Sequence, residues 1–356
     1  MFKIVEVYFD LVYLLLMMGF GLALLLEKGK RAKLLAAMAI LLALGDACHL
    51  LPRVYGHLSP GGLAGNRMYL SYGQMITSLT MSVFYLLYFY YYRSAGGKTT
   101  KGRQWTLFCL LALRVFLVLL PVNNWGGESP YAMALIRNIP FLIMGLALVA
   151  WTYGDREISG FKRASYLIAA SFFFYALVVI VSPFIPAFGA FMLPKTICYI
   201  LLVDGLYEKE AGKVDGRKIG KGAVVCLELG LLLGALYREF ARINGFTERT
   251  TLSLAHPHML LLGAVFSFAL FLYLRVEKED GRNLHKNYRF YLLTIYYFIA
   301  SLVIRGIYTL ASGGAALYPD GALSGMAGLG HIALTISIIA LILKARREEQ
   351  AIEQTA

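Results

Sequence analysis

Long apolar runs separated by short polar segments make up nearly the whole chain. Each run has the length that an α-helix needs to cross the hydrocarbon core of a bilayer, roughly 20 residues. Glycines, prolines and charge clusters between the runs indicate where the helices end. The pattern predicts an all-α, polytopic transmembrane bundle of about eleven helices, at residues 4–26, 33–52, 67–92, 104–121, 131–153, 164–183, 188–207, 222–241, 251–275, 288–311 and 323–345.

The positions of the basic residues predict how these helices are oriented. Alternate loops carry 24 of the 34 lysines and arginines, whereas the loops on the opposite side carry 6. Cytoplasmic loops are enriched in these residues. We therefore expect the amino terminus outside and the carboxyl terminus in the cytoplasm, with the chain in the lipid bilayer of a bacterial cytoplasmic membrane.

The overall composition excludes a water-soluble domain. Hydrophobic residues make up 59% of the chain and charged residues 15%, with a mean hydropathy of +0.64, which is more apolar surface than a soluble core can bury. The formal charge of +13 lies in short loop clusters, so no nucleic-acid partner is expected. The cysteines stand singly, without the spacing of metal ligands, and we interpret them as packing residues.

One polar connection divides the chain into two modules. The segment from Glu208 to Lys221 contains three glycines and five cations. It predicts a seven-helix transmembrane bundle at 1–207, a basic cytoplasmic linker at 208–221, a four-helix transmembrane module at 222–345 and a cytoplasmic tail at 346–356.

Polar residues in the expected seven-helix bundle gather at similar depth. Charged side chains inside a bilayer are costly, so they mark functional or paired positions. The helix directions place most of this set in the outer half of the membrane and Lys195 nearer its middle; the set is Glu6, Asp10, Asp46, His49, Gln74, Arg114, Arg137 and Lys195. These residues predict an outward-facing polar cavity that binds a small ligand, and its three cations favour an anion.

Two interpretations of this set therefore remain open. The acids, Asp10 and Asp46, either hold the cations of a ligand site in place or close a set of structural salt bridges that locks the bundle. The first alternative describes a receptor or transporter, and the second a structural or assembly protein. No nucleotide-binding loop is recognisable, so the sequence favours a non-enzyme without deciding the matter.

Two local patterns sharpen the expected structure. The motif G-D-A-C-H-L-L-P-R at 45–53 places Asp46 and His49 on one helix face, and Pro52 is expected to end that helix. Tyrosines near the cytoplasmic end of the third run predict an aromatic belt at the level of the lipid headgroups: Tyr85, Tyr88, Tyr90, Tyr91 and Tyr92.

The carboxyl-terminal module carries a specific set of motifs. They are Y-R-E-F-A-R-I-N-G-F-T-E-R-T-T-L-S-L-A-H-P-H-M-L-L-L-G at 237–263, R-G-I-Y at 305–308 and S-G-M-A-G-L-G-H at 324–331. On these residues the region from about 222 to 345 resembles an uncharacterised family of small bacterial four-helix membrane proteins. The resemblance implies the four-helix fold and no particular activity.

Two histidines of this module are expected at one depth on different helices. His258 and His331, with Arg305 nearby, match what axial ligation of haem b requires, since an arginine can pair with a propionate. This pattern predicts a membrane redox or haem-sensing protein that could exchange electrons with quinone. The alternatives are interhelical hydrogen bonding, or a proton relay or divalent-metal site with Glu228 and Glu239. The ligand and any homo-oligomer are left open.

Overall fold

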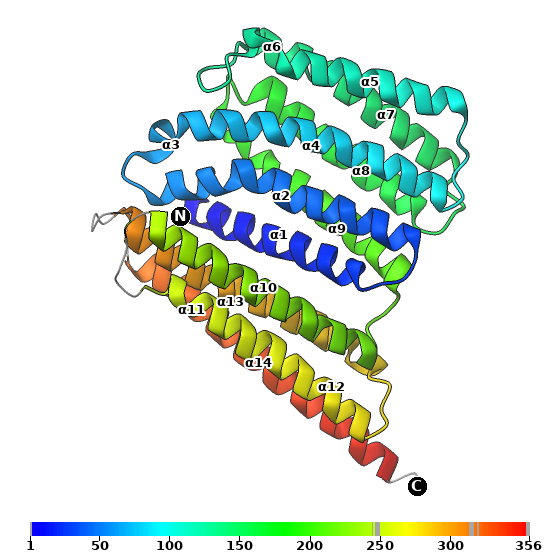
Figure 1. Cartoon of the computed structure of the whole chain (residues 1–356), viewed down its shortest axis with the longest axis vertical. Helices are drawn as coiled ribbons and strands as arrows, with labels where there is room; N and C mark the ends of the chain where they lie inside the picture. The colour runs from blue at the N-terminus through cyan, green and yellow to red at the C-terminus, as the bar shows by residue number, and fades with distance from the viewer. Residues whose placement is uncertain (1, 244, 246–249, 313–316, 319, 354–356) are drawn as a thin grey trace. The chain divides into compact units, whose positions relative to one another are not determined.

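The computed structural model describes residues 2–243, 245, 250–312, 317, 318 and 320–353, and these residues are helical apart from turns and short loops, with no strand among them (Figure 1). Ten helices in this described part of the chain are long and apolar enough to cross a membrane. The prediction of an all-α, multi-pass membrane protein is thus confirmed in its class. The count of eleven is not, because the expected helix at 67–92 forms but is not among the ten.

The helices of the first part follow the predicted apolar runs closely. Two of the runs form more than one element: 131–153 forms α6 and α7, and 188–207 forms η2 and α9. The elements are α1 (Phe2–Leu25), α2 (Lys30–Leu58), α3 (Gly62–Gly65), α4 (Arg67–Ser94), α5 (Lys101–Leu119), η1 (Pro121–Asn123), α6 (Tyr131–Ile136), α7 (Ile139–Gly154), α8 (Phe161–Val181), η2 (Pro186–Phe191) and α9 (Met192–Ala211).

The later elements include a π-helix. The run at 251–275 forms α11, a π-helical segment and α12 in succession. The elements are α10 (Gly216–Ile243), α11 (Leu252–His258), the π-helix η3 (Met259–Val265), α12 (Phe266–Val276), η4 (Arg282–Leu284), α13 (His285–Ala311) and α14 (Asp320–Glu353).

One local expectation differs from the structure, and in two further segments the helices extend beyond the expected apolar runs. Helix α2 does not end at Pro52 but continues to Leu58; proline removes one backbone donor, and helices in a membrane protein tolerate that loss where neighbouring groups satisfy the freed carbonyl. The expected linker at 208–221 is mostly helical, because α9 ends at Ala211 and α10 begins at Gly216. The expected tail is helical to Glu353, and residues 354–356 lie outside the described residues.

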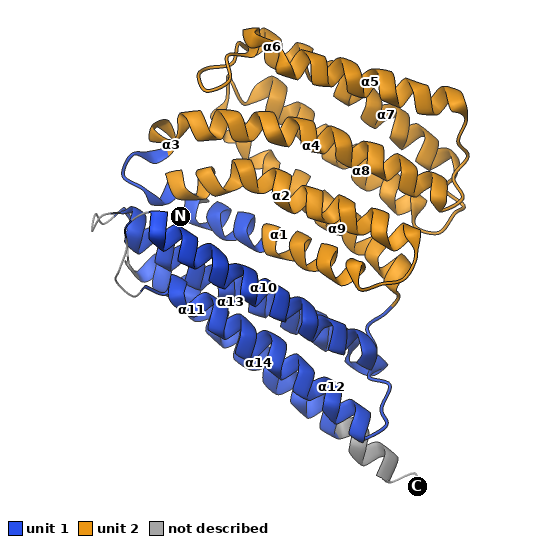
Figure 2. Ribbon diagram, viewed as in Figure 1, with its two compact units in different colours: residues 1–12, 57–62, 213–356 blue, residues 13–56, 63–212 orange. Residues whose placement is uncertain are grey.

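Two compact units make up the chain, and each is described by itself (Figure 2). Unit 2 contains residues 13–56 and 63–212. Unit 1 contains residues 213–356 together with the amino-terminal residues 1–12 and the short segment 57–62. The seven-helix and four-helix boundaries expected from the sequence remain a prediction.

Four of the five tyrosines expected in an aromatic belt on α4 are in the interior of unit 2, and Tyr90 is half-buried. Tyr85, Tyr88, Tyr91 and Tyr92 are each fully buried, so an aromatic belt does not explain them. Their hydroxyls bond to groups on other helices: Tyr85 to Tyr199 Oη at 3.2 Å, Tyr88 to Thr152 Oγ1 at 3.4 Å, Tyr91 to Glu210 Oε1 at 2.7 Å, and Tyr92 to Asp155 Oδ2. The tyrosine hydroxyls therefore tie α4 to α7 and α9.

Small residues bring the helices of unit 2 close together. A Cβ at Gly73 of α4 would collide with the backbone of Cys48 in α2, and a Cβ at Gly145 of α7 would collide with the Phe172 ring of α8. Close approach at small residues is the usual way in which membrane helices pack. This packing holds the polar side chains of neighbouring helices within hydrogen-bonding distance.

Candidate functional site

Arg114 lies at the centre of a polar network in unit 2. Its side chain, on α5, is 1% exposed. Nε donates to Ser82 Oγ at 2.8 Å, while Nη1 donates to the Arg137 carbonyl oxygen at 2.6 Å and to Asn138 Oδ1 at 2.9 Å. The guanidinium carbon also lies 4.2 Å from the centre of the Phe141 ring. Neutral oxygens and an aromatic face thus surround this cation.

Arg137 is the second buried cation of the network, with 3% of its side chain exposed. Its Nη1 donates to Asn123 Oδ1 and to Ser129 Oγ, each at 2.8 Å. The guanidinium carbon lies 4.4 Å from the centre of the Trp125 ring. Both hydrogen bonds use Nη1, so Nε and Nη2 keep donor capacity.

A break between two short helices places the backbone that Arg114 binds. Helix α6 ends at Ile136, and α7 begins at Ile139 with Pro140 in its first turn. Proline has no backbone N–H, so the carbonyl four residues before it has no helical donor. For Pro140 that carbonyl is the one of Ile136, the last residue of α6. Arg137 and Asn138 lie between the two helices, and the Arg137 carbonyl accepts from Arg114.

No carboxylate pairs with Arg114 or Arg137 among the described residues, because every acceptor of their hydrogen bonds is a neutral oxygen. Buried cations in proteins are normally paired with an anion. The positive charge of Arg114 also acts unfavourably on that of Arg137. The arrangement leaves positive charge that an anion would neutralise.

Asn138 and Tyr175 connect Arg114 to a third cation, Lys195. Asn138 Oδ1 accepts from Arg114 and from Tyr175 Oη, the latter at 2.9 Å. Lys195 Nζ lies 5.2 Å from the centre of the Tyr175 ring and 5.3 Å from that of Tyr199. The lysine side chain is buried on α9. The three cations thus belong to one continuous polar network.

Asp46 is the acid of this network. Tyr13 Oη donates to Asp46 Oδ2 at 2.6 Å, and the carboxylate of Asp46 attracts the ammonium of Lys195. No hydrogen bond or ion pair joins Asp46 to Lys195 or to either arginine among the described contacts, so the pairing of an acid with Lys195 stays a prediction.

The described contacts of the other expected ligand-binding residues involve different groups. His49 Nδ1 lies 3.3 Å from the Leu70 carbonyl oxygen, and the side chain of Gln74 is exposed on α4. Asp10 is buried on α1, in the segment of that helix that belongs to unit 1. Of the eight expected residues, hydrogen bonds and ring contacts connect Arg114, Arg137 and Lys195, and Asp46 interacts by charge with Lys195.

Sequence reasoning did not find the neutral partners of the arginines. They come from α4, the segment between α5 and α6, the break between α6 and α7, and α8. They are Ser82, Asn123, Trp125, Ser129, Asn138 and Tyr175. The sequence does carry one usable signal. Asn and Arg stand side by side at 137–138 just before a proline, where a helix break exposes backbone acceptors inside an apolar run.

The two expected haem ligands meet at one phenyl ring in unit 1. The Phe298 ring centre lies 5.6 Å from that of His258 and 4.5 Å from that of His331, both edge-on. His258 Nδ1 bonds to the Leu254 carbonyl oxygen at 2.7 Å. His331 and Arg305 are exposed on their helices. Within the described residues, no group of three or more His, Cys, Asp or Glu side chains could hold a metal ion.

A π-helix directly follows His256 and His258 of α11. Pro257 lies in α11, and η3 begins at Met259, just after His258. Such segments are often found at functional positions of helices. The Nδ1 atom of His256 is buried and has no hydrogen-bond partner among the described residues, while its ring packs near Gly234 of α10.

Part of unit 1 matches the model of one known protein family. Residues 217–348 match the model of a family described as a protein of unknown function (DUF2871). The match covers less than half of the chain. It includes neither Arg114, Arg137 and Lys195 nor the residues that contact them. No curated protein matches the chain. No solved structure matches it either.

Proposed function

We propose that unit 2 binds a small anion, entering from the outer face of the membrane, at Arg114 and Arg137, with Lys195 contributing positive charge. The chain would thus act as a receptor or transporter. The observation that supports this is the burial of two neighbouring guanidiniums whose described acceptors are all neutral. Charge-assisted bonds from arginine to a carboxylate, sulfate or phosphate are short, strong and frequently bidentate.

The unused N–H donors of Arg137 favour a bound ligand over a set of purely structural salt bridges. A lock would bring a carboxylate to each guanidinium, as Glu210 is brought to Arg31 at 3.3 Å elsewhere in unit 2. Here the one described acid of the network, Asp46, interacts by charge with Lys195 and bonds to neither arginine. The Nε and Nη2 atoms of Arg137 remain for an oxyanion, which would offset the repulsion between the two arginines.

A thermal unfolding assay of the detergent-purified full-length protein tests this proposal. Sulfate, phosphate, succinate and glutamate are compared at constant ionic strength. A ligand that binds only the folded state stabilises it by about 2.7 kcal/mol at a hundred times its Kd. We expect one of these anions to raise the unfolding temperature of the wild type, and Arg137→Gln to abolish the effect.

The matched control is Arg156→Gln, which removes an exposed arginine outside the network. It should respond to the anion as the wild type does. If all four anions leave the wild type unchanged, or if both variants respond equally, the arginines are structural and the proposal is wrong.

A second candidate function, haem binding in unit 1, has one observation in its favour. The bond from His258 Nδ1 to Leu254 orients the imidazole and leaves Nε2 for a ligand, as in many metal-binding histidines. Against it, both imidazoles pack on Phe298, and a haem between them would displace that ring from at least one. A Soret band that is lost in His258→Ala and His331→Ala would establish haem binding. Colourless protein from haem-supplied cells would show that the two histidines serve only in helix packing.

The proposed orientation, with the carboxyl terminus in the cytoplasm, rests on the loop cations. Carboxyl-terminal fusions to green fluorescent protein and to alkaline phosphatase test it in a bacterial host. Fluorescence without phosphatase activity supports the orientation, and the reverse pattern contradicts it.

A further inference from the structure

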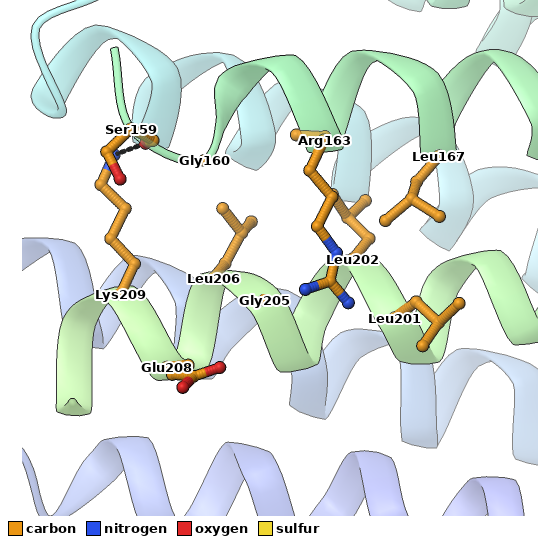
Figure 3. A pocket seen from close by; sticks show the side chains of 11 residues that line it. Ser159, Gly160, Arg163, Leu167, Leu201, Leu202, Gly205, Leu206, Glu208 and Lys209 are labelled. Atoms are coloured by element: carbon orange, nitrogen blue, oxygen red, sulfur yellow. Dashed lines mark hydrogen bonds between the residues drawn. The ribbon is translucent and has the colours of Figure 1, made fainter. Parts of the chain in front are cut away.

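A cavity of about 370 Å³ lies in unit 2 between the start of α8 and the last turns of α9 (Figure 3). Its lining is divided by chemistry. Arg163, Lys209 and Glu208 supply charge, whereas leucines of α8 and α9 supply an apolar wall: Leu167, Leu201, Leu202 and Leu206. A cavity with a charged part and an apolar part fits an amphiphile better than a simple ion.

The Arg163 side chain of α8 lies next to Gly205 of α9. An added Cβ at Gly205 would lie 3.5 to 3.6 Å from the guanidinium atoms of Arg163, so the missing side chain makes room for the cation. Figure 3 shows this side chain reaching from α8 toward α9. Among the described residues Arg163 makes no hydrogen bond and no ion pair, so its planar set of donors is available to a ligand.

Lys209 provides the second cation. Its Nζ donates to the Ser159 carbonyl oxygen at 2.7 Å and lies 4.6 Å from the centre of the Phe161 ring. These contacts hold the ammonium next to the turn before α8, with further N–H donors unused. The carboxylate of Glu208 lies on the side of α9 away from α8 (Figure 3), so it does not neutralise Arg163.

The cavity lies at the membrane side that carries the cation-rich loops. The preceding loop holds Arg156, and the positive-inside rule assigns this side to the cytoplasm. The start of α8 and the end of α9 then lie at the level of the inner headgroups, and the leucines continue toward the hydrocarbon region. Basic pockets between helices on this side are suited to anionic lipid headgroups.

We propose that this α8–α9 cavity binds the phosphate headgroup of an anionic phospholipid of the cytoplasmic leaflet. Arg163 and Lys209 contact the phosphate, and an acyl chain runs along Leu167 and Leu201. The apolar wall favours a lipid over a free phosphate ester, because only the lipid carries a chain to cover it. This proposal is independent of the anion site at Arg114 and Arg137, and it uses none of its residues.

The test measures lipid binding to the full-length protein in a neutral detergent by native mass spectrometry. Phosphatidylglycerol, phosphatidylcholine and glycerol phosphate are compared. We expect phosphatidylglycerol to bind, phosphatidylcholine to bind more weakly, and glycerol phosphate not to bind. Arg163→Gln should weaken phosphatidylglycerol binding about fivefold, the contribution of one cation near an anionic headgroup.

Arg156→Gln, which removes a cation of the same loop outside the cavity, should bind phosphatidylglycerol as the wild type does. Gly205→Leu should block the cavity and reduce binding as Arg163→Gln does; if that variant does not fold, the exposed Arg163→Gln decides alone. Equal binding of both phospholipids, or an equal effect of both arginine variants, overturns the proposal. Binding of glycerol phosphate as tight as that of the lipid shows a free phosphate site and overturns the lipid assignment.

Discussion

Arg114 donates a hydrogen bond from Nη1 to the main-chain carbonyl oxygen of Arg137, across 2.6 Å and inside the helix bundle of unit 2. The bond links one buried arginine to the main chain of another. Neither guanidinium has a described carboxylate partner, so this pair is costly for stability unless an anion joins it. Proteins commonly accept such costs at functional sites.

Replacing Arg137 by glutamine should therefore cost little stability when no anion is present. The variant removes the repulsion with Arg114, and the glutamine amide can still donate to Asn123. We expect the free energy of unfolding in anion-poor buffer to fall by less than about 1 kcal/mol, or to rise, because neutral replacements of buried charges are often neutral or stabilising. Chemical denaturation in detergent measures it. A loss of about 3 kcal/mol or more would indicate a structural lock.

Removing the Tyr13 hydroxyl should destabilise unit 2. Tyr13→Phe deletes the 2.6 Å bond to Asp46 and leaves the carboxylate with less compensation. Hydrogen bonds to charged groups contribute about 1.5 to 3 kcal/mol, and we expect a loss in that range by the same denaturation assay. Tyr69→Phe is the control, because Tyr69 is 64% exposed; an equal effect of both variants would contradict the role of the bond.

Asp155 should make stability depend on pH in the acidic range. Burial alone raises the pKa of this carboxyl, but the hydrogen bonds from Tyr92 Oη and the Lys98 backbone, with the charges of Lys98 and Arg103, lower the pKa below its ordinary value. A lowered folded-state pKa stabilises the protein fully above the unfolded value of about 3.9, and this contribution is lost as the pH falls through the folded value.

The comparison of wild type with Asp155→Asn measures this contribution. The variant should be less stable at pH 7 by about 1.5 to 3 kcal/mol, and the difference should shrink as the pH falls below about 4. Asp280→Asn, at a carboxylate whose side chain is 61% exposed, should show a smaller difference. A gap between wild type and Asp155→Asn that stays constant from pH 7 to pH 3 would refute the assignment.

The close contact of α4 with α2 predicts that Gly73→Ala destabilises the protein. The new methyl group would collide with the Cys48 carbonyl, and overpacking of this kind typically costs about 1 to 3 kcal/mol. Gly65→Ala is the matched control, since nothing lies within 4 Å of a Cβ there. Thermal unfolding in detergent distinguishes the two, and equal stability of both variants would show that α2 and α4 do not pack at Gly73.

The helices were predictable because an apolar run of about 20 residues in this composition has one stable arrangement in a bilayer. Their ends were less predictable. Pro52 was expected to end its helix, yet α2 continues through it to Leu58. A sequence pattern shows the lost donor but not the neighbouring groups that satisfy the freed carbonyl.

The sequence predicted how deep in the membrane the site residues lie, but not which way their side chains point from their helices. Depth along a helix identified Arg114, Arg137, Lys195 and Asp46, but it did not show which helix face each residue occupies. Gln74 has a similar expected depth and is exposed. The tyrosines of α4 illustrate the same limit, although the spacing of Tyr85, Tyr88 and Tyr92 by three and four residues could have indicated one buried helix face.

The central claim, an anion bound at Arg137, is tested most directly with Trp125, whose ring lies 4.4 Å from the guanidinium carbon. Trp105→Phe with Trp151→Phe leaves Trp125 as the one tryptophan of the chain. Titration of this full-length variant with sulfate, phosphate, succinate and glutamate should give a saturable change in Trp125 emission for one of them, and Arg137→Gln in the same background should abolish it. Emission unchanged by all four anions, or changed equally after Arg137→Gln, would contradict the claim.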